Sequence, residues 1–324
     1  MNGQPDGRPQ GNGLNRRRMR QIRQQKIRTT LLSLCIVIIL LLVTLAVFLF
    51  CAIADELNAD QGGPNTPPVV PPAQSDTTVR YTDIQKSNSD IRVGDLLLVN
   101  LDHYYDPASA QDLTVIGGTQ GTPPTYEVPY PSWKLNANTL NAFNGMMKKY
   151  YELSGDDSVK VSSAYRTAED QAGKATPVGH SDHHTGYCLA LRTVAGGYLE
   201  DDHWIYQNGH RYGFILRYPN EKSDKTGVSD YEYCIRYVGI PHATYISQNG
   251  LCLEEYVELL RSTYTGNNHL QITDHNGVRY EVYYVPASAE GATTVRVPNN
   301  YAFTISGDNA GGFIVTVDLS QRLA

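Results

Sequence analysis

The segment GHSDHHTGYCLALRT, residues 179–193, holds the side chains with the clearest capacity for chemistry. Ser181, His183 and Gly186 stand at the spacing of a metal-binding loop, in which a histidine nitrogen supplies one ligand. A ligand carboxylate is expected at position 190, but the residue there is Ala190, which has no donor atom. The segment therefore predicts either a rebuilt metal site or a scaffold that no longer holds a metal.

The sequence around this segment predicts a mixture of helices and short strands. Apolar residues recur at helical spacing between 136 and 155, and Gly155 supplies the stop. Strands are predicted at 95–101, 159–167, 187–194, 214–219 and 234–240, and helices at 136–155, 202–214 and 251–264. This mixture predicts an α+β fold around a small, mostly antiparallel sheet.

The N-terminal part has the pattern of a membrane anchor. Residues 1–30 carry eight Lys or Arg and one Asp, and 31–54 are free of charge. A helix over 31–54 rises about 36 Å, enough to cross a bilayer, and the basic block on its N-terminal side favours a cytoplasmic tail. A cleavable signal peptide is disfavoured because the apolar run is too long. The Pro- and Gly-rich stretch 55–79 is typical of a linker, so we expect a single-pass protein of the cell membrane with residues 80–324 outside.

The chain after the linker divides into two regions with different sequence patterns. Residues 80–262 have the α+β pattern, whereas 263–324 alternate apolar and polar residues between turn signals such as HNG, AEG and PNN. We therefore predict a core domain followed by a small all-β appendage of four or five strands. Because the bulk of the chain is acidic, nucleic acid is not expected as a partner.

Several stretches together resemble one family. SSAYRTAEDQ, GHSDHHTG, HRYGFILRYP and RYVGIPHA…GLCLEEY are similar, in order and spacing, to the VanY-type D-alanyl-D-alanine carboxypeptidases across roughly residues 90–262. The resemblance implies the fold of a zinc peptidase core that handles peptidoglycan stem peptides ending in D-alanine. In that family a His and an Asp from the loop and a second His bind zinc, and a Glu acts as general base.

Carried over residue by residue, the resemblance predicts an incomplete catalytic set. His183 occupies the first ligand position, and Ala190 occupies the Asp position. Aligning RYVG puts Cys234 at the second His and Tyr231 at the base. A shift of one residue makes Glu232 the base but leaves an isoleucine as ligand. Two ligands and the base are therefore replaced, and zinc is expected to be absent or bound in a non-standard way.

The substrate side of the resemblance is better preserved. Arg166, Gln171 and Ser181 fall where the family grips its peptide. A guanidinium can donate two parallel hydrogen bonds to a terminal carboxylate, which suits a peptide ending in D-alanine. These three residues are the predicted substrate-binding set.

Three cysteines follow the linker, and two of them bear on the site. Cys188 precedes Ala190 by two, so on a strand both side chains face the same way, toward Cys234 if Ala190 faces the old zinc position. The pair could form a disulfide, join His183 in a Cys₂His metal site, or remain two buried thiols. We favour the disulfide over the metal, with free thiols as an equal alternative. Cys252 is expected in the core.

The functional hypothesis is a membrane-anchored protein that binds stem peptides ending in D-alanine, or a protein partner, without cutting them. Two alternatives stay open. One is an active zinc D-Ala-D-Ala carboxypeptidase with a remodelled site around His183 and Cys234, and the other is a structural partner in an envelope complex.

Overall fold

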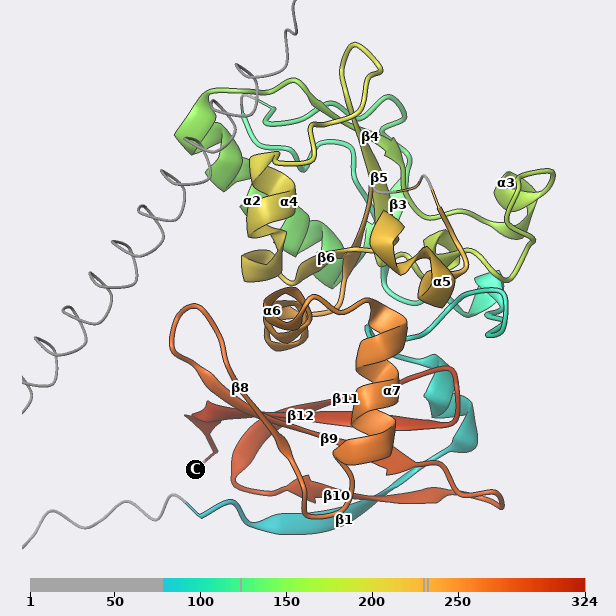
Figure 1. The fold of residues 1–324 in the computed structure, drawn as a ribbon, viewed down its shortest axis with the longest axis vertical. Coiled ribbons are helices and arrows are strands. Elements are labelled where there is room, and N and C mark those ends of the chain that lie inside the picture. The colour runs from blue at the N-terminus through green and yellow to red at the C-terminus, as the bar shows by residue number, and fades with distance from the viewer. Residues whose placement is uncertain (1–77, 123, 230, 232, 324) are drawn as a thin grey trace, which may run out of the picture. The chain divides into compact units, whose positions relative to one another are not determined.

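The structure is a computed structural model that describes residues 78–122, 124–229, 231 and 233–323 (Figure 1). These residues fall within one compact unit, Thr77–Ala324. The predicted cytoplasmic tail, the predicted transmembrane helix and the linker up to residue 77 lie outside the described residues. Among the helices that are described, none combines the length and the apolar character needed to cross a membrane.

Helices and antiparallel strands are mixed along the described chain, which confirms the predicted α+β class. The helices are α2 (Ala137–Ser154), α3 (Ala168–Gln171), α4 (Trp204–Asn208), α5 (Ser223–Thr226), α6 (Ile240–Asn249) and α7 (Leu253–Thr263). The central sheet has the order β4 (Val159–Ser163), β5 (Cys188–Thr193), β7 (Cys234–Tyr237) and β6 (Phe214–Leu216). A C-terminal sheet has the order β11 (Tyr301–Gly307), β12 (Gly312–Arg322), β9 (Arg279–Pro286) and β8 (Leu270–Thr273). Two strand pairs complete the set, β1 (Tyr81–Lys86) with β10 (Thr293–Pro298) and β2 (Leu113–Val115) with β3 (Lys134–Asn136).

Helix α2 forms where the sequence predicts it. The Asn136 side chain accepts a hydrogen bond from the Asn138 backbone N–H, which caps the first turn. Gly155 ends the helix at φ 69°, a conformation that costs glycine little. The buried stripe of α2 packs on the central sheet in the main hydrophobic cluster, which includes Phe143 and Leu189. The helix thus covers the sheet that carries the candidate site.

The prediction of a strand over residues 95–101 is wrong. The run DLLLVNL is buried but joins no sheet, because arginine side chains satisfy its backbone instead. Arg236 Nη2 donates to the Leu97 carbonyl at 3.0 Å, and Arg217 Nη2 donates to the Val99 carbonyl at 3.2 Å. Buried backbone groups need partners, and guanidinium groups can supply them as a neighbouring strand would.

The same arginines surround one buried carboxylate. Asp182, Arg217 and Arg236 all have fully buried side chains. The Nε of each arginine donates to a different Asp182 oxygen, at 2.9 Å from Arg236, and Arg217 also makes a bidentate pair with Glu254 of α7 at 2.8 and 3.0 Å. Burial raises the pKa of Asp182, but the charges of Arg236 and Arg217 outweigh it and lower the pKa overall. The ionised carboxylate therefore joins β7 to Arg217, the residue directly after β6, and through Arg217 to α7.

The C-terminal segment contributes β8 to β12, and it also recruits the start of the described chain. Residues 81–86, which fall in the predicted core range 80–262, pair with β10 rather than with the central sheet, in a register from Tyr81–Pro298 to Lys86–Thr293. In Figure 1 this strand, in blue, runs beside the red β10. The first strand after the linker is therefore part of the C-terminal β structure.

Helices α6 and α7 lie between the central sheet and the C-terminal strands (Figure 1). Their buried residues share one hydrophobic cluster with β6, β8, β9 and β12. Inside it, His242 of α6 contacts the Tyr256 hydroxyl of α7 at 2.7 Å and the Thr316 hydroxyl of β12 at 3.0 Å. Burial lowers the pKa of His242 to about 3. A neutral imidazole therefore links the two layers.

This linkage predicts that stability falls in mild acid. The folded pKa of His242 lies below the unfolded value of about 6.5, so the unfolded state binds the proton first as the pH falls. The contribution is complete above pH ~6.5 and is lost toward pH ~3, with a loss of about 2 kcal/mol by pH 5. Urea unfolding of the full chain at pH 7.5 and 5.0 should show this loss, and His242→Gln should reduce it. The exposed His275→Gln is the matched control, and equal pH dependence in wild type and His242→Gln would contradict the linkage.

Candidate functional site

The first candidate ligand lies on a short 3₁₀ turn, Asp182–Thr185, directly before β5. The turn ends at Gly186 with φ 77°, and a Cβ there would come within 3.1 Å of the Asn136 backbone nitrogen. Glycine is therefore required both for the backbone angle and for the close approach. His183 is placed by this turn and by its neighbour Asp182, whose carboxylate is fixed by two arginines.

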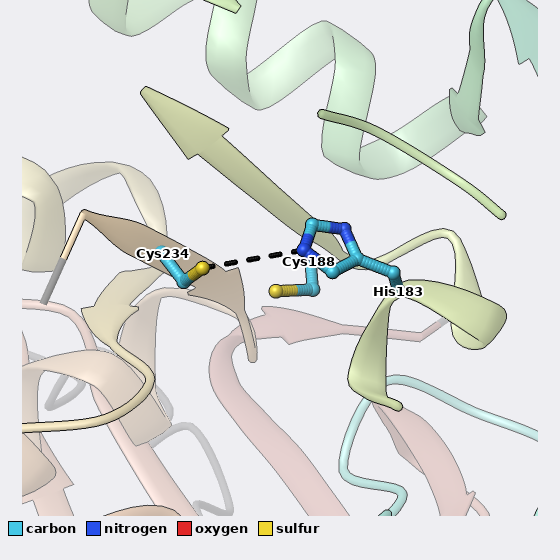
Figure 2. A group of neighbouring side chains, drawn as sticks. All are labelled: His183, Cys188 and Cys234. Carbon is cyan, nitrogen blue, oxygen red and sulfur yellow. Dashed lines mark hydrogen bonds between the residues drawn. The ribbon is translucent and has the colours of Figure 1, made fainter. Parts of the chain in front are cut away.

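Three side chains come together at one end of the central sheet. The potential ligand atoms of His183, Cys188 and Cys234 all lie within 4.8 Å of one another, and all three residues are buried. Cys234 Sγ lies 4.0 Å from His183 Nε2. Figure 2 shows the imidazole ring and the two sulfur atoms facing one another, with His183 from the turn, Cys188 from β5 and Cys234 from the start of β7. The structure thus brings together His183, Cys188 and Cys234, the three residues of the predicted Cys₂His alternative.

The imidazole of His183 is held in one orientation. Its Nδ1 lies 2.8 Å from the Ala164 carbonyl, which can only accept a hydrogen bond, so Nδ1 carries the proton. The other nitrogen, Nε2, faces the sulfur atoms. Histidine ligands in metal sites are usually oriented in this way by a second hydrogen bond. The neighbouring His184 turns elsewhere, to the Arg166 carbonyl and the Gly179 N–H.

The strand register explains which side chains meet. Ala190 is the direct partner of Cys234, and Cys188 is the direct partner of Arg236. Cys188 and Ala190 face the same side of β5, so the sulfur of Cys188 lies beside the vacant ligand position. Diagonal neighbours such as Cys188 and Cys234 usually have Cα atoms about 7–8 Å apart, at the limit of what a disulfide can bridge. All three described cysteines are free, which contradicts the disulfide alternative.

The two thiols of the cluster have different acidities. The hydrogen bond with Cys188 lowers the pKa of Cys234, His183 and the charge of Arg166 lower it further, and burial opposes them. Burial and the thiolate of Cys234 raise the pKa of Cys188 well above its ordinary value. The geometry therefore favours a thiolate on Cys234 and a protonated Cys188, an arrangement in which one sulfur is ready to act as a ligand or nucleophile.

Tyr231, at the predicted base position, belongs to an aromatic group and carries no carboxylate. Its ring lies 6.4 Å from that of Tyr218 and 5.4 Å from that of Tyr233. Tyr233 in turn covers the guanidinium of Arg192 at 3.6 Å. The adjacent candidate base, Glu232, lies outside the described residues.

Arg166 is held beside the cluster by two side chains. Its Nε donates to the Ser163 hydroxyl at 2.9 Å, and its Nη1 donates to Gln171 Oε1 at 3.1 Å. Gln171 is buried and donates through Nε2 to the Thr176 carbonyl at 2.7 Å. Both polar atoms of Gln171 are therefore engaged within the protein, so it positions Arg166. Ser181 is buried directly before the turn that carries His183.

Two residues that fix the site were missed by sequence reasoning. Ser163 orients Arg166, and nothing in its local sequence indicates this. Asp182 anchors the turn, and a signal for it did exist. Arg217 and Arg236 interrupt the apolar stretches FILRYP and CIRYVGI, and buried arginines in strands require a buried partner.

Comparisons with known proteins agree on one family. The family model VanY, D-alanyl-D-alanine carboxypeptidase, matches residues 160–240. A D-alanyl-D-alanine carboxypeptidase of Enterococcus faecium is 35% identical over 167 residues, 48% of this chain and 53% of that protein. The bifunctional D-Ala-D-Ala dipeptidase and carboxypeptidase VanXYC of Enterococcus gallinarum is 48% identical over 98 residues, 30% of this chain and 49% of that protein. The chain thus spans about half the length of these relatives.

Solved structures extend the likeness beyond the matched segment. A crystal structure of the vancomycin-resistance D,D-dipeptidase VanXYg, in complex with a D-Ala-D-Ala phosphinate analog, is 26% identical with a TM-score of 0.61, and covers 74% of this chain and 99% of that chain. A structure of a VanY D,D-pentapeptidase variant contains Zn(II), with 28% identity, a TM-score of 0.39, and coverage of 50% of this chain and 98% of that chain. From the matched segment and these relatives, residues 160–240 form a domain similar to the VanY-type D-alanyl-D-alanine carboxypeptidases.

Proposed function

We propose that the folded part of this chain is an extracytoplasmic module that binds peptidoglycan stem peptides ending in D-alanine and does not hydrolyse them. The proposal separates the two halves of a peptidase site. The predicted peptide-binding residues Arg166, Gln171 and Ser181 are present. The positions expected to hold catalytic carboxylates carry Ala190 and Tyr231 instead.

The observation that carries this proposal is the composition of the donor group. Within the part of the chain that the structure describes, His183, Cys188 and Cys234 are the only His, Cys, Asp or Glu side chains grouped closely enough to hold a metal. The group contains no carboxylate, although the family resemblance puts one at Ala190 and another at Tyr231. A tyrosine, with an ordinary pKa of about 10, is a poor general base at neutral pH.

The gripping half is supported by the setting of Arg166. Ser163 and Gln171 fix two of its donors, so its guanidinium is ordered before any ligand arrives. An ordered guanidinium loses less conformational entropy on binding a carboxylate than a mobile one. VanXYg, which shares the fold, was solved with an analog of D-Ala-D-Ala. A peptide with a terminal D-alanine carboxylate is therefore the ligand that we assign to this site.

The family's zinc also fits the donor chemistry of this site. Thiolate and imidazole are ordinary zinc ligands, and the fixed Nδ1 hydrogen bond of His183 leaves Nε2 for coordination. His183, Cys188 and Cys234 would hold the ion, which supplies Lewis acidity to a coordinated water or carbonyl. These three residues also favour a second candidate function, a hydrolytic carboxypeptidase with a remodelled centre. The experiments below distinguish the two.

Arg166→Ala should abolish most of the binding of a peptide that ends in D-Ala-D-Ala. Hydrogen bonds to a charged group contribute about 1.5–3 kcal/mol, so the dissociation constant should rise by at least about tenfold. Isothermal titration calorimetry on the full chain measures this change. Arg211→Ala, which removes an exposed arginine of the same domain, is the matched control and should leave binding unchanged.

The ligand provides a second control for the same experiment. A peptide with an amidated C-terminus lacks the charge that pairs with Arg166 and should bind as weakly to wild type as the free acid binds to Arg166→Ala. Equal binding of the free acid to wild type and to Arg166→Ala would show that Arg166 does not bind the terminal carboxylate.

Restoring the carboxylates should create hydrolysis. Wild type is expected to release no D-alanine from a D-Ala-D-Ala peptide, with or without added zinc. The triple variant Ala190→Asp, Tyr231→Glu and Cys234→His should release D-alanine at least about 100-fold faster than the background rate of the assay, because a positioned general base alone contributes about 10²–10⁴. A coupled D-alanine assay measures the rate, and His183→Ala in the triple background is the control. Release by wild type that disappears in His183→Ala would establish the second candidate instead.

The membrane location is part of the proposal and rests on residues 31–54. The full chain should remain with the membrane pellet after alkaline carbonate extraction. Ile39→Arg with Val43→Arg should release it, because each charge near the bilayer centre costs about 2.5–3.5 kcal/mol. Ile39→Leu with Val43→Leu is the matched control, and extraction of wild type into the supernatant would refute the anchor.

A further inference from the structure

We propose that His183, Cys188 and Cys234 bind one zinc ion, with a ligand taken from position 188 of β5 in place of position 190. The inference deepens the proposed function, on which it rests for the identity of the site, and it names the metal that the site would bind. Relative to the family pattern, the ligand has moved by two residues along one strand, and a carboxylate has been exchanged for a thiolate.

The strand geometry makes such a move possible. Residues 188 and 190 lie on the same face of β5, one pleat apart. Ala190 pairs directly with Cys234 but has no donor atom, and a side chain one pleat away on the same face can supply one. The structure shows this outcome, since Cys188 and not Ala190 joins His183 and Cys234 in the cluster (Figure 2).

The spacing of the donors is close to what zinc needs. Zn–S bonds of about 2.3 Å and Zn–N bonds of about 2.0 Å in a tetrahedron separate the donor atoms by about 3.6–3.8 Å. Cys234 Sγ and His183 Nε2 are 4.0 Å apart, and all three donors lie within 4.8 Å of one another. The Cys234–His183 pair would have to close by a few tenths of an ångström, and the widest pair by up to about 1 Å, to complete the site.

The surroundings hold the donors in place. Cys188 and Cys234 lie on adjacent paired strands, and the turn that carries His183 is anchored through Asp182 to Arg217 and Arg236. Two thiolates and an imidazole select a thiophilic ion such as zinc over magnesium or calcium, which prefer oxygen ligands. Three protein ligands leave the fourth tetrahedral position free for a ligand atom.

Metal content and cobalt spectroscopy test this inference on the full chain, purified under reducing conditions with zinc present. Elemental analysis should find about one zinc per chain. Replacement of zinc by Co²⁺ should give intense sulfur-to-cobalt charge-transfer absorption, and Cys188→Ser or Cys234→Ser should each lose about half of it. Each substitution should also lower the affinity for the metal. Loss of a residue that only hydrogen-bonds to a ligand lowers metal affinity by about 10–100-fold, and loss of a ligand should lower it further. Cys252→Ser, which changes the third buried thiol, is the matched control and should keep both the zinc and the spectrum.

A second variant distinguishes loss of a ligand from loss of the fold. Cys188→Ala with Ala190→Asp moves the ligand back to position 190, and it should retain zinc while its cobalt spectrum shows one thiolate. Unchanged metal content and spectrum in Cys188→Ser would overturn the inference. A chain without metal whose Cys188 and Cys234 are joined by a disulfide, or are both free, would also overturn it.

The outcomes for zinc and for hydrolysis are separable. Bound zinc without release of D-alanine supports both the zinc site and the binding function. Bound zinc with release overturns only the non-hydrolytic function, whereas peptide binding by a metal-free wild type overturns only the zinc site.

Discussion

One buried carboxylate organises the core of this protein. Asp182 accepts hydrogen bonds from Arg217 and Arg236, and none of the three side chains is accessible to solvent. Each arginine also donates through Nη2 to a carbonyl of the 95–101 segment. Arg217 pairs in addition with Glu254 of α7. Loss of a single charge would leave the others uncompensated in the interior, at a cost of about 3–5 kcal/mol. The arrangement therefore works only as a complete set.

The ion network also fixes the metal-ligand candidates, because its residues are close to them in the sequence. Asp182 precedes His183 on the same turn, and Arg236 lies two residues after Cys234 on β7. Because consecutive residues of a strand point to opposite faces, Cys234 and Arg236 share a face, and the ion network sits next to the donor cluster. The residues at the donor positions can therefore be substituted while the Asp182–Arg217–Arg236 network continues to hold the backbone that positions them. That is how a chain can keep the fold of a peptidase and present thiols where oxygen and nitrogen ligands are expected.

Local signals in the sequence were enough for the elements that depend on local contacts. Helix α2 follows from its apolar spacing and Gly155, and β5 follows from its short apolar run. Local sequence patterns did not predict the elements whose structure depends on residues far away in the sequence. The 95–101 run looks like a strand until Arg217 and Arg236 take its carbonyls, and the strand at 81–86 reveals nothing of its partner β10. The grouping of Cys188 with Cys234 and His183 could be anticipated from strand alternation and the family resemblance, but the register between β5 and β7 that produces it is set by no local pattern.

The pairing of β1 with β10 has a consequence for biosynthesis. Tyr81 meets Pro298, so the two strands are separated by more than two hundred residues of chain. At about 5–20 residues per second, a ribosome needs about 10–40 s to make that interval. During this time β1 has an unpaired edge, the kind of surface on which chains aggregate. The charged side chains of Asp83 and Lys86, which lie on opposite faces of this strand, give the nascent chain some protection until its partner emerges.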